Sequence, residues 1–177
     1  RMMLLRTICV LGLLGWLAGC GGGGGSNGPA PLASCALPLT YIAGLSGVGI
    51  PESSPVNWTS TTADVTRTIS SCAIQQLQQA QINICIEASN ISQLDAQLVP
   101  PSAPAVSLAL QSATSTQGCT GVITSTSGKL WTLTLSGTLL SNITNFNGNW
   151  LVQVRDGMPD TNTSTLVGWS LNLAGVR

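Results

Sequence analysis

The stretch of the chain that decides the fold is FNGNWLVQVRD, residues 146–156, followed by LVGWSLNL, residues 166–173. In each part a tryptophan and two aliphatic residues occupy alternate positions, namely Trp150, Val152 and Val154, and then Trp169, Leu171 and Leu173. Because successive side chains of a β-strand point to opposite faces, each set lies on one face of a strand. We therefore expect two strands joined by a polar turn as a hairpin, in which cross-strand pairs contribute roughly 0.2–1 kcal/mol each.

The same alternation recurs in the preceding part of the chain. Further sets are Ile82, Ile84 and Ile86; Leu94, Ala96 and Leu98; Val106, Leu108 and Leu110; and Trp131, Leu133 and Leu135. Turn signals lie between or beside such sets, at Ser127-Gly128, Asn147-Gly148 and Asp156-Gly157. Only residues 73–81 have a helix-forming composition, and their flanks are typical of strands. The pattern predicts an all-β fold, a jelly-roll-like β-sandwich of about eight short strands.

The N-terminus has the pattern of an export signal. Arg1 and Arg6 precede a mostly apolar stretch, residues 8–19, which is shorter than the roughly 20 residues that a membrane-spanning helix needs. The stretch ends in Leu-Ala-Gly-Cys20, which resembles the lipobox of bacterial lipoproteins. That resemblance implies that residues 1–19 are a signal peptide and that Cys20 is lipidated. The alternative is an ordinary cleaved secretory signal in which Cys20 is incidental.

Residues 20–31 contain a glycine run, GGGGGSNGPAP, that predicts a flexible tether with a reach of roughly 15–20 Å. In the resembling Gram-negative lipoproteins an Asp just after the lipidated cysteine favours retention in the inner membrane, so Gly21 favours the outer membrane. We expect residues 32–63 to be a segment that packs on the domain or leads into it, and residues 64–177 to form the sandwich.

Four further cysteines lie in the part of the chain that we expect to be exported: Cys35, Cys72, Cys85 and Cys119. An even number in an oxidising compartment predicts two disulfides, for which three pairings exist. Proximity in the sequence favours Cys72–Cys85 together with Cys35–Cys119. A zinc site is the competing interpretation, but the sequence has neither a CxxC pair nor a histidine.

Charge and composition exclude several classes of function. Only 7% of the residues are charged and the formal net charge is zero, whereas duplex-binding surfaces need clustered Lys and Arg. The absence of histidine excludes Ser-His-Asp and Cys-His mechanisms. A glycosidase-like pair could be drawn from the six carboxylates, but their spacing nominates none. We therefore expect a protein that is not an enzyme and does not bind nucleic acid.

Two other features are candidate binding sites. In DGMPDTN, residues 156–162, oxygen atoms of Asp156, Asp160 and Asn162 could bind Ca²⁺, although these side chains could equally hold the amides of a long turn. Trp58 lies among polar residues and is a candidate for stacking on a glycan. The tryptophans in the alternating sets are instead expected in the core.

Residues 146–173 resemble the closing hairpin of the P domain (Homo B domain) that follows the catalytic domain of subtilisin-like proprotein convertases. The shared pattern is Gly, Trp, alternating apolar residues and Asp, then an acidic turn, then Leu, Trp, Ser and Leu. A weaker match covers residues 82–104, where the apolar frame and Pro101 are kept. There the family's His, Asp, Ser, Gly and Thr are replaced by Ala88, Gln93, Pro100, Ala103 and Pro104.

The P-domain resemblance implies a module that stabilises or accompanies a protease. We therefore expect a lipid-anchored envelope protein that interacts with another envelope protein, with a protease as the favoured partner. The alternative is a glycan-binding module of the cell surface, because jelly rolls often carry lectin sites.

Overall fold

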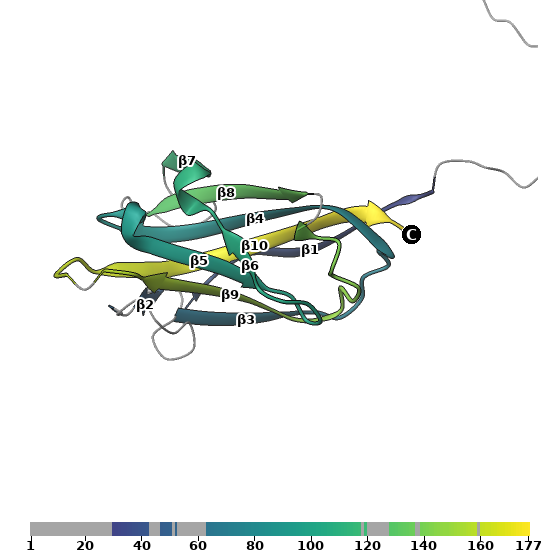
Figure 1. The fold of residues 1–177 in the computed structure, drawn as a ribbon, viewed down its shortest axis with the longest axis horizontal. Helices are drawn as coiled ribbons and strands as arrows, with labels where there is room; N and C mark the ends of the chain where they lie inside the picture. The colour runs from purple at the N-terminus through teal and green to yellow at the C-terminus, as the bar shows by residue number, and fades with distance from the viewer. Residues whose placement is uncertain are drawn as a thin grey trace, which may run out of the picture.

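The computed structural model describes residues 30–42, 47–50, 52, 63–117, 119, 128–136, 139–158 and 160–177. These residues form ten β-strands and two short 3₁₀-helices, and no α-helix occurs among them. The strands make two antiparallel sheets that pack face to face as a β-sandwich (Figure 1). The prediction of an all-β sandwich is confirmed, with ten strands in place of about eight.

The larger sheet has the strand order β1-β10-β4-β8-β7, with β2 paired to β10. Its strands are β1 (Leu32–Tyr41), β2 (Val48–Ile50), β4 (Gln76–Ala88), β7 (Thr114–Gln117), β8 (Lys129–Ser136) and β10 (Ser164–Val176). Leu32 pairs with Val176, so the start of β1 and the C-terminus lie at the same end of the sandwich (Figure 1). Most of β1 therefore lies within the sheet, as the partner of β10.

The smaller sheet has the order β3-β9-β5-β6. Its strands are β3 (Ala63–Ile69), β5 (Leu94–Val99), β6 (Val106–Leu108) and β9 (Gly148–Asp156). The 3₁₀-helix η2 (Ile91–Gln93) precedes β5, and the 3₁₀-helix η3 (Leu110–Ser112) follows β6. Leu110, expected to continue a strand, thus lies in a helical turn, where it is still buried.

The core lies between the sheets and contains every apolar set that the alternation predicted. Trp150 and Trp169 have no exposed surface, and Trp131 is 9% exposed. Fully burying a large aliphatic side chain contributes about 1.5–3 kcal/mol, so these inward faces account for much of the stability of the sandwich. The polyglutamine-like start of β4 is a strand despite its helix-forming composition, because Leu77 and Ala80 pack against the same core.

The predicted hairpin of residues 146–173 is wrong. β9 pairs with β3 and β5 in the smaller sheet, whereas β10 pairs with β1, β2 and β4 in the larger sheet. The loop between β9 and β10 therefore crosses from one sheet to the other. Trp150 and Trp169 both lie in the core because each points inward from its own sheet. The alternation specified the buried face of each strand but not the sheet to which it belongs.

The predicted disulfide pairing is also wrong. The disulfides are Cys35–Cys72 and Cys85–Cys119, with Cα separations of 5.6 Å and 5.8 Å. Cys72 precedes β4, and Cys85 lies roughly 30 Å along that strand at about 3.3 Å per residue, beyond the reach of a disulfide. Proximity in the sequence failed because an extended strand separates the two residues.

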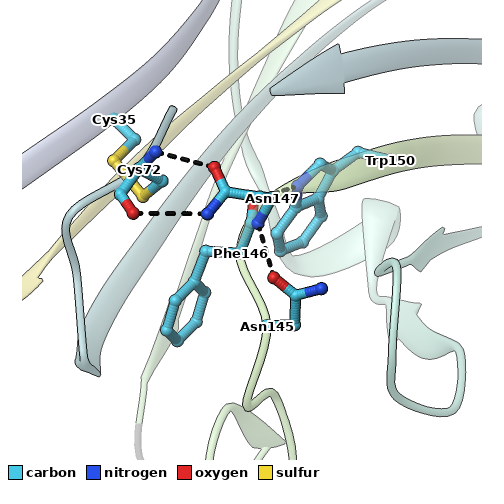
Figure 2. Close-up of a disulfide and its surroundings, with 6 residues drawn as sticks. All are labelled: Cys35, Cys72, Asn145, Phe146, Asn147 and Trp150. Carbon is cyan, nitrogen blue, oxygen red and sulfur yellow. Dashed lines mark hydrogen bonds between the residues drawn. A yellow bond between two sulfur atoms is a disulfide. The ribbon is translucent and has the colours of Figure 1, made fainter. Parts of the chain in front are cut away.

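Each disulfide ties a segment to the larger sheet. Cys35 lies in β1 and its bond to Cys72 fixes the segment that leads into β4 (Figure 2). Cys85 points to the outer face of β4, where it packs with Cys119 and Val167 in a small cluster separate from the core. The hydroxyl of Tyr41 donates to the carbonyl of Cys119 at 2.9 Å. Cys119 is therefore held against the outside of the sheet by a covalent bond and a hydrogen bond.

Candidate functional site

Four carboxylates lie close enough at one end of the sandwich for their charges to interact. This acidic end consists of Glu52, Gln93, Asp95, Asp156, Asp160 and Asn162. The register of β5 against β9 pairs Leu94 with Asp156, and an isolated parallel bridge places Glu52 beside Asp156. The loop between β9 and β10, called the acidic loop, contains Asp160 and Asn162. β10 begins after this loop and ends at Val176, so the acidic end lies at the opposite end of the sandwich from the C-terminus (Figure 1).

Asp156 is the buried carboxylate of this end, with 1% of its surface exposed. Its Oδ1 accepts a hydrogen bond from the backbone N–H of Met158 at 3.0 Å. Its Oδ2 is buried and has no hydrogen-bond partner among the described residues. Burial raises the pKa of Asp156 above its ordinary value, the bond from Met158 opposes that rise, and the charges of Glu52, Asp160 and Asp95 add to it.

Asp160 is exposed and organises the loop between β9 and β10. Its Oδ1 accepts from the backbone N–H of Asn162 at 2.6 Å, and its Oδ2 accepts from the side-chain amides of Asn162 at 2.6 Å and Gln93 at 2.7 Å. These hydrogen bonds, that from the Asn162 backbone first, lower the pKa of Asp160. Its own backbone N–H donates to the carboxylate of Glu52 at 2.8 Å.

Gln93 links β5 to the acidic loop. Its backbone carbonyl accepts from the N–H of Gly157 at 2.9 Å, and its amide nitrogen donates to Asp160. Its Oε1 is buried and, like Oδ2 of Asp156, has no hydrogen-bond partner in the described part of the chain. Asp95 is compensated differently, by an ion pair with Arg155 at 2.9 Å.

The structure brings the predicted Asp156, Asp160 and Asn162 into one loop, in which the two aspartates hold turn amides. Glu52, Gln93 and Asp95 also lie at this end, which no sequence pattern predicted. The described residues contain no group of three or more His, Cys, Asp or Glu side chains arranged to hold a metal ion.

Two open grooves of about 500 Å³ and 530 Å³ lie elsewhere on the surface. The first is lined by Gln75, Gln76, Leu77, Gln78, Leu140, Ser141, Ile143 and Thr144. The second runs beside Pro100, Pro101 and the asparagines at 145, 147 and 149. Neither lining contains a carboxylate, lysine, arginine or cysteine, so neither groove offers a titratable acid–base pair.

Two of the predicted site residues lie outside the described residues. These are Cys20, with the signal peptide and most of the tether, and Trp58. The described tryptophans Trp131, Trp150 and Trp169 are buried, as expected for core residues. Within the described residues, no helix is long and apolar enough to cross a membrane.

No family model and no curated protein sequence matches the chain. Among solved structures, the fold is similar to a chain in the crystal structure of the Aeromonas sobria serine protease and the chaperone, with a TM-score of 0.50 and 16% identity. The likeness is one of fold. A second crystal structure, of the serine protease of Aeromonas sobria, gives a TM-score of 0.49 and 17% identity. In both cases the alignment covers 85% of this chain but only 28% of the other.

Proposed function

We propose that this protein is a non-catalytic, lipid-anchored β-sandwich that binds and stabilises a protease in the bacterial cell envelope. The observation that carries the proposal is the fold, which over 85% of the chain is similar to part of a serine-protease structure. The resemblance of residues 146–173 to a P domain points to the same class of protein. The crystal structure with that fold is one of a protease and a chaperone, which supports a protein partner.

The chemistry of the described surface supports binding rather than catalysis. On the outer face of the larger sheet, Thr132 donates to Asn83 at 2.8 Å, and Asn83 donates to Ser170 at 2.9 Å. This row of hydroxyl and amide groups runs across three neighbouring strands and carries no charge. Ser170 is buried in this row, and the partly exposed Asn83 and Thr132 present an uncharged polar surface to a partner without the cost of desolvating ions.

The anchor is tested by metabolic labelling of the full chain with an alkyne-bearing fatty acid in a Gram-negative host. We expect the wild type to be labelled and recovered with membranes, and Cys20→Ser to lose both properties. As a control, Cys9→Ser changes a cysteine within the predicted signal peptide, and this variant is expected to remain labelled. Label that persists in Cys20→Ser would exclude lipidation at this residue.

The interaction is tested with the purified full chain as bait on detergent-solubilised envelope of the source organism. Captured material is assayed for proteolytic activity and identified by mass spectrometry, with the reduced and denatured chain as control. We expect a protease to be retained by the native bait alone. Retention of the bait on insoluble envelope polysaccharide, with no protease captured, would overturn the proposal and favour a glycan-binding module.

A further inference from the structure

We infer that the end of the sandwich opposite the acidic end rests on a phospholipid bilayer, which it contacts through Leu32 and Leu139. The inference rests on the lipid anchor of the proposed function and adds the face that meets the membrane. The sheet register assembles this face, because Leu32 pairs with Val176, and Val176 pairs with Gln76 at the start of β4. We call it the neutral end, and it comprises residues 30–34, 70–78, 100–104, 139–147 and 175–177.

Loops of both sheets contribute to the neutral end. β8 ends there, since Ser136 pairs with Gln79 near the start of β4, and the exposed Leu139 follows. In the smaller sheet, Ile69 at the end of β3 pairs with Gly148 at the start of β9. The chain runs on from β3 into β4, so these strand ends lie at the same end of the sandwich (Figure 1). The neutral end is therefore one surface built from separate parts of the chain.

Exposed apolar side chains are concentrated at the neutral end. The described residues expose three large ones, of which Leu32 at 77% and Leu139 at 53% lie at this end. The third, Met158, lies in the acidic loop. Three strand spacings separate β1 from β8 in the larger sheet, so the strands that lead to the two leucines lie roughly 14 Å apart. A bilayer is broad enough to contact both, and burial of apolar surface drives binding at its interface.

The charges of the chain are distributed in a way that suits this orientation. The residues of the neutral end include no Asp, Glu or Lys, and their one charged side chain is that of the exposed Arg177. The backbone N–H of Arg177 donates to the carbonyl of Pro31 at 3.1 Å, which holds the two termini of the sandwich together. Anionic headgroups attract such a cation and repel carboxylates. Contact through the neutral end therefore keeps the acidic end away from the lipid phosphates.

The length of chain that precedes the sandwich selects the same end. Residues 21–29 separate Cys20 from the first described residue, and the predicted tether reaches roughly 15–20 Å. β10 has 13 residues and spans about 43 Å at 3.3 Å per residue. The acidic end thus lies about twice as far from the start of the sandwich as the tether reaches. Because β1 begins at the neutral end, the anchor holds that end near the bilayer.

The test places the purified, lipidated full chain in nanodiscs of phosphatidylethanolamine and phosphatidylglycerol. A keto-bearing phenylalanine analogue replaces Asn142 in the neutral end or Thr161 in the acidic loop, both exposed, and carries a nitroxide without involving the cysteines. Collisions of the nitroxide with oxygen, relative to those with a water-soluble nickel complex, increase where it approaches the bilayer. We expect this ratio to be at least about threefold higher for the label at Asn142 than for the label at Thr161.

Substitutions of the exposed apolar side chains decide whether they make the contact. Leu32→Ser combined with Leu139→Ser is expected to lower the ratio at Asn142 to that at Thr161. Met158→Ser removes an equally exposed side chain from the opposite end and is expected to leave the ratio unchanged.

The possible failures of the anchor and of the contact are distinguishable. A chain that does not co-elute with the nanodiscs would refute the lipid anchor and this inference together. A chain that co-elutes, but whose two labels give equal ratios, would leave the anchor standing and overturn the inference. A ratio at Asn142 that is unaffected by the paired leucine substitutions would overturn it as well.

Discussion

The guanidinium of Arg67 joins the two sheets by binding Trp169. Its Nη1 donates to the backbone carbonyl of Trp169 at 3.0 Å, and its central carbon lies 5.4 Å from the centroid of the indole ring. The same Nη1 donates to the carbonyl of Pro38 at 2.6 Å. Pro38 lies where the register between β1 and β10 shifts, between Leu37 and Thr40. Arg67, from β3 of the opposite sheet, thus supplies a donor at the point where the ladder is interrupted.

Replacement of Arg67 by methionine is expected to destabilise the fold by about 2 kcal/mol, because two carbonyl groups lose a charged donor and the indole loses its cation. The free energy of unfolding is measured by urea denaturation. Arg177→Met removes an exposed charge at the end of the chain and is expected to change stability by less than about 0.5 kcal/mol. Equal urea midpoints for Arg67→Met and the wild type would show that the contacts of Arg67 with Trp169 and Pro38 do not stabilise the fold.

The side chain of Asn147 holds the segment that carries Cys72 (Figure 2). Its Oδ1 accepts from the N–H of Cys72 at 2.7 Å, and its Nδ2 donates to the carbonyl of the same residue at 3.4 Å. Asp at position 147 keeps the acceptor but sets a carboxylate oxygen against that carbonyl. We expect Asn147→Asp to cost about 1 kcal/mol in chemical denaturation.

Asn149 provides a matched control for this substitution. It is also exposed, but its Oδ1 only accepts a hydrogen bond, from the hydroxyl of Thr68 at 2.7 Å. Asn149→Asp preserves that bond and is expected to remain within about 0.5 kcal/mol of the wild type. The same loss for both variants would mean that added charge, and not the contact with Cys72, is responsible.

Gly168 allows β1 to approach β10. A Cβ at this position would lie 2.5 Å from the backbone carbonyl oxygen of Thr40, which cannot move without disturbing the ladder. Gly168→Ala is therefore expected to destabilise by about 1–3 kcal/mol. Thermal unfolding of both variants measures the effect. Gly49, in the neighbouring β2, has no atom within 4 Å of such a Cβ, so Gly49→Ala is expected to leave stability nearly unchanged. A nearly unchanged stability of Gly168→Ala would show that β1 can shift away from β10 at little cost.

The disulfide pairing is checked by peptide mapping without reduction. Cleavage after Arg67, Glu87 and Lys129 gives a fragment 68–87 with Cys72 and Cys85, and a fragment 88–129 with Cys119. The observed pairing joins both to the fragment that contains Cys35, whereas pairing by sequence proximity would close a bond within 68–87. A further cut after Leu77 separates Cys72 from Cys85. It is expected to leave Cys72 joined to the Cys35 fragment and Cys85 joined to the Cys119 fragment.

The sequence predicted the buried face of each strand because that information is local. Alternation placed Ile82, Trp150 and Trp169 in the core, and the pattern Val65, Arg67, Ile69 also puts Arg67 at an inward position, a signal that was not used. Strand partners were not predictable in this way. Whether β9 pairs with β10 or with β3 depends on the whole set of strands, which a two-residue period does not encode.

The residues of the acidic end were likewise predictable only where they lie close together in the sequence. Asp156, Asp160 and Asn162 belong to one loop and were found together. Glu52 lies 108 residues before Asp160, and Gln93 lies 67 residues before it, so only the sheet register and a single bridge bring them there. No spacing rule in the sequence anticipates these contacts.

The buried charge of Asp156 predicts a specific dependence of stability on pH. Burial, with repulsion from Glu52, Asp160 and Asp95, raises its folded-state pKa above the ordinary value of 3.8 despite the bond from Met158. The folded protein therefore binds this proton more tightly than the unfolded chain does. Acidification from pH 7 through the folded pKa towards 3.8 removes the penalty of the buried charge and so favours the fold.

Asp156→Asn isolates this effect, because the amide carries no charge at any of these pH values and the other groups remain in both proteins. We expect the free energy of unfolding of the wild type to increase relative to that of Asp156→Asn as the pH falls from 7 towards 4. Urea denaturation at several pH values measures the difference. If the stability of the wild type relative to Asp156→Asn stays constant or falls on acidification, the folded state does not raise the pKa of Asp156.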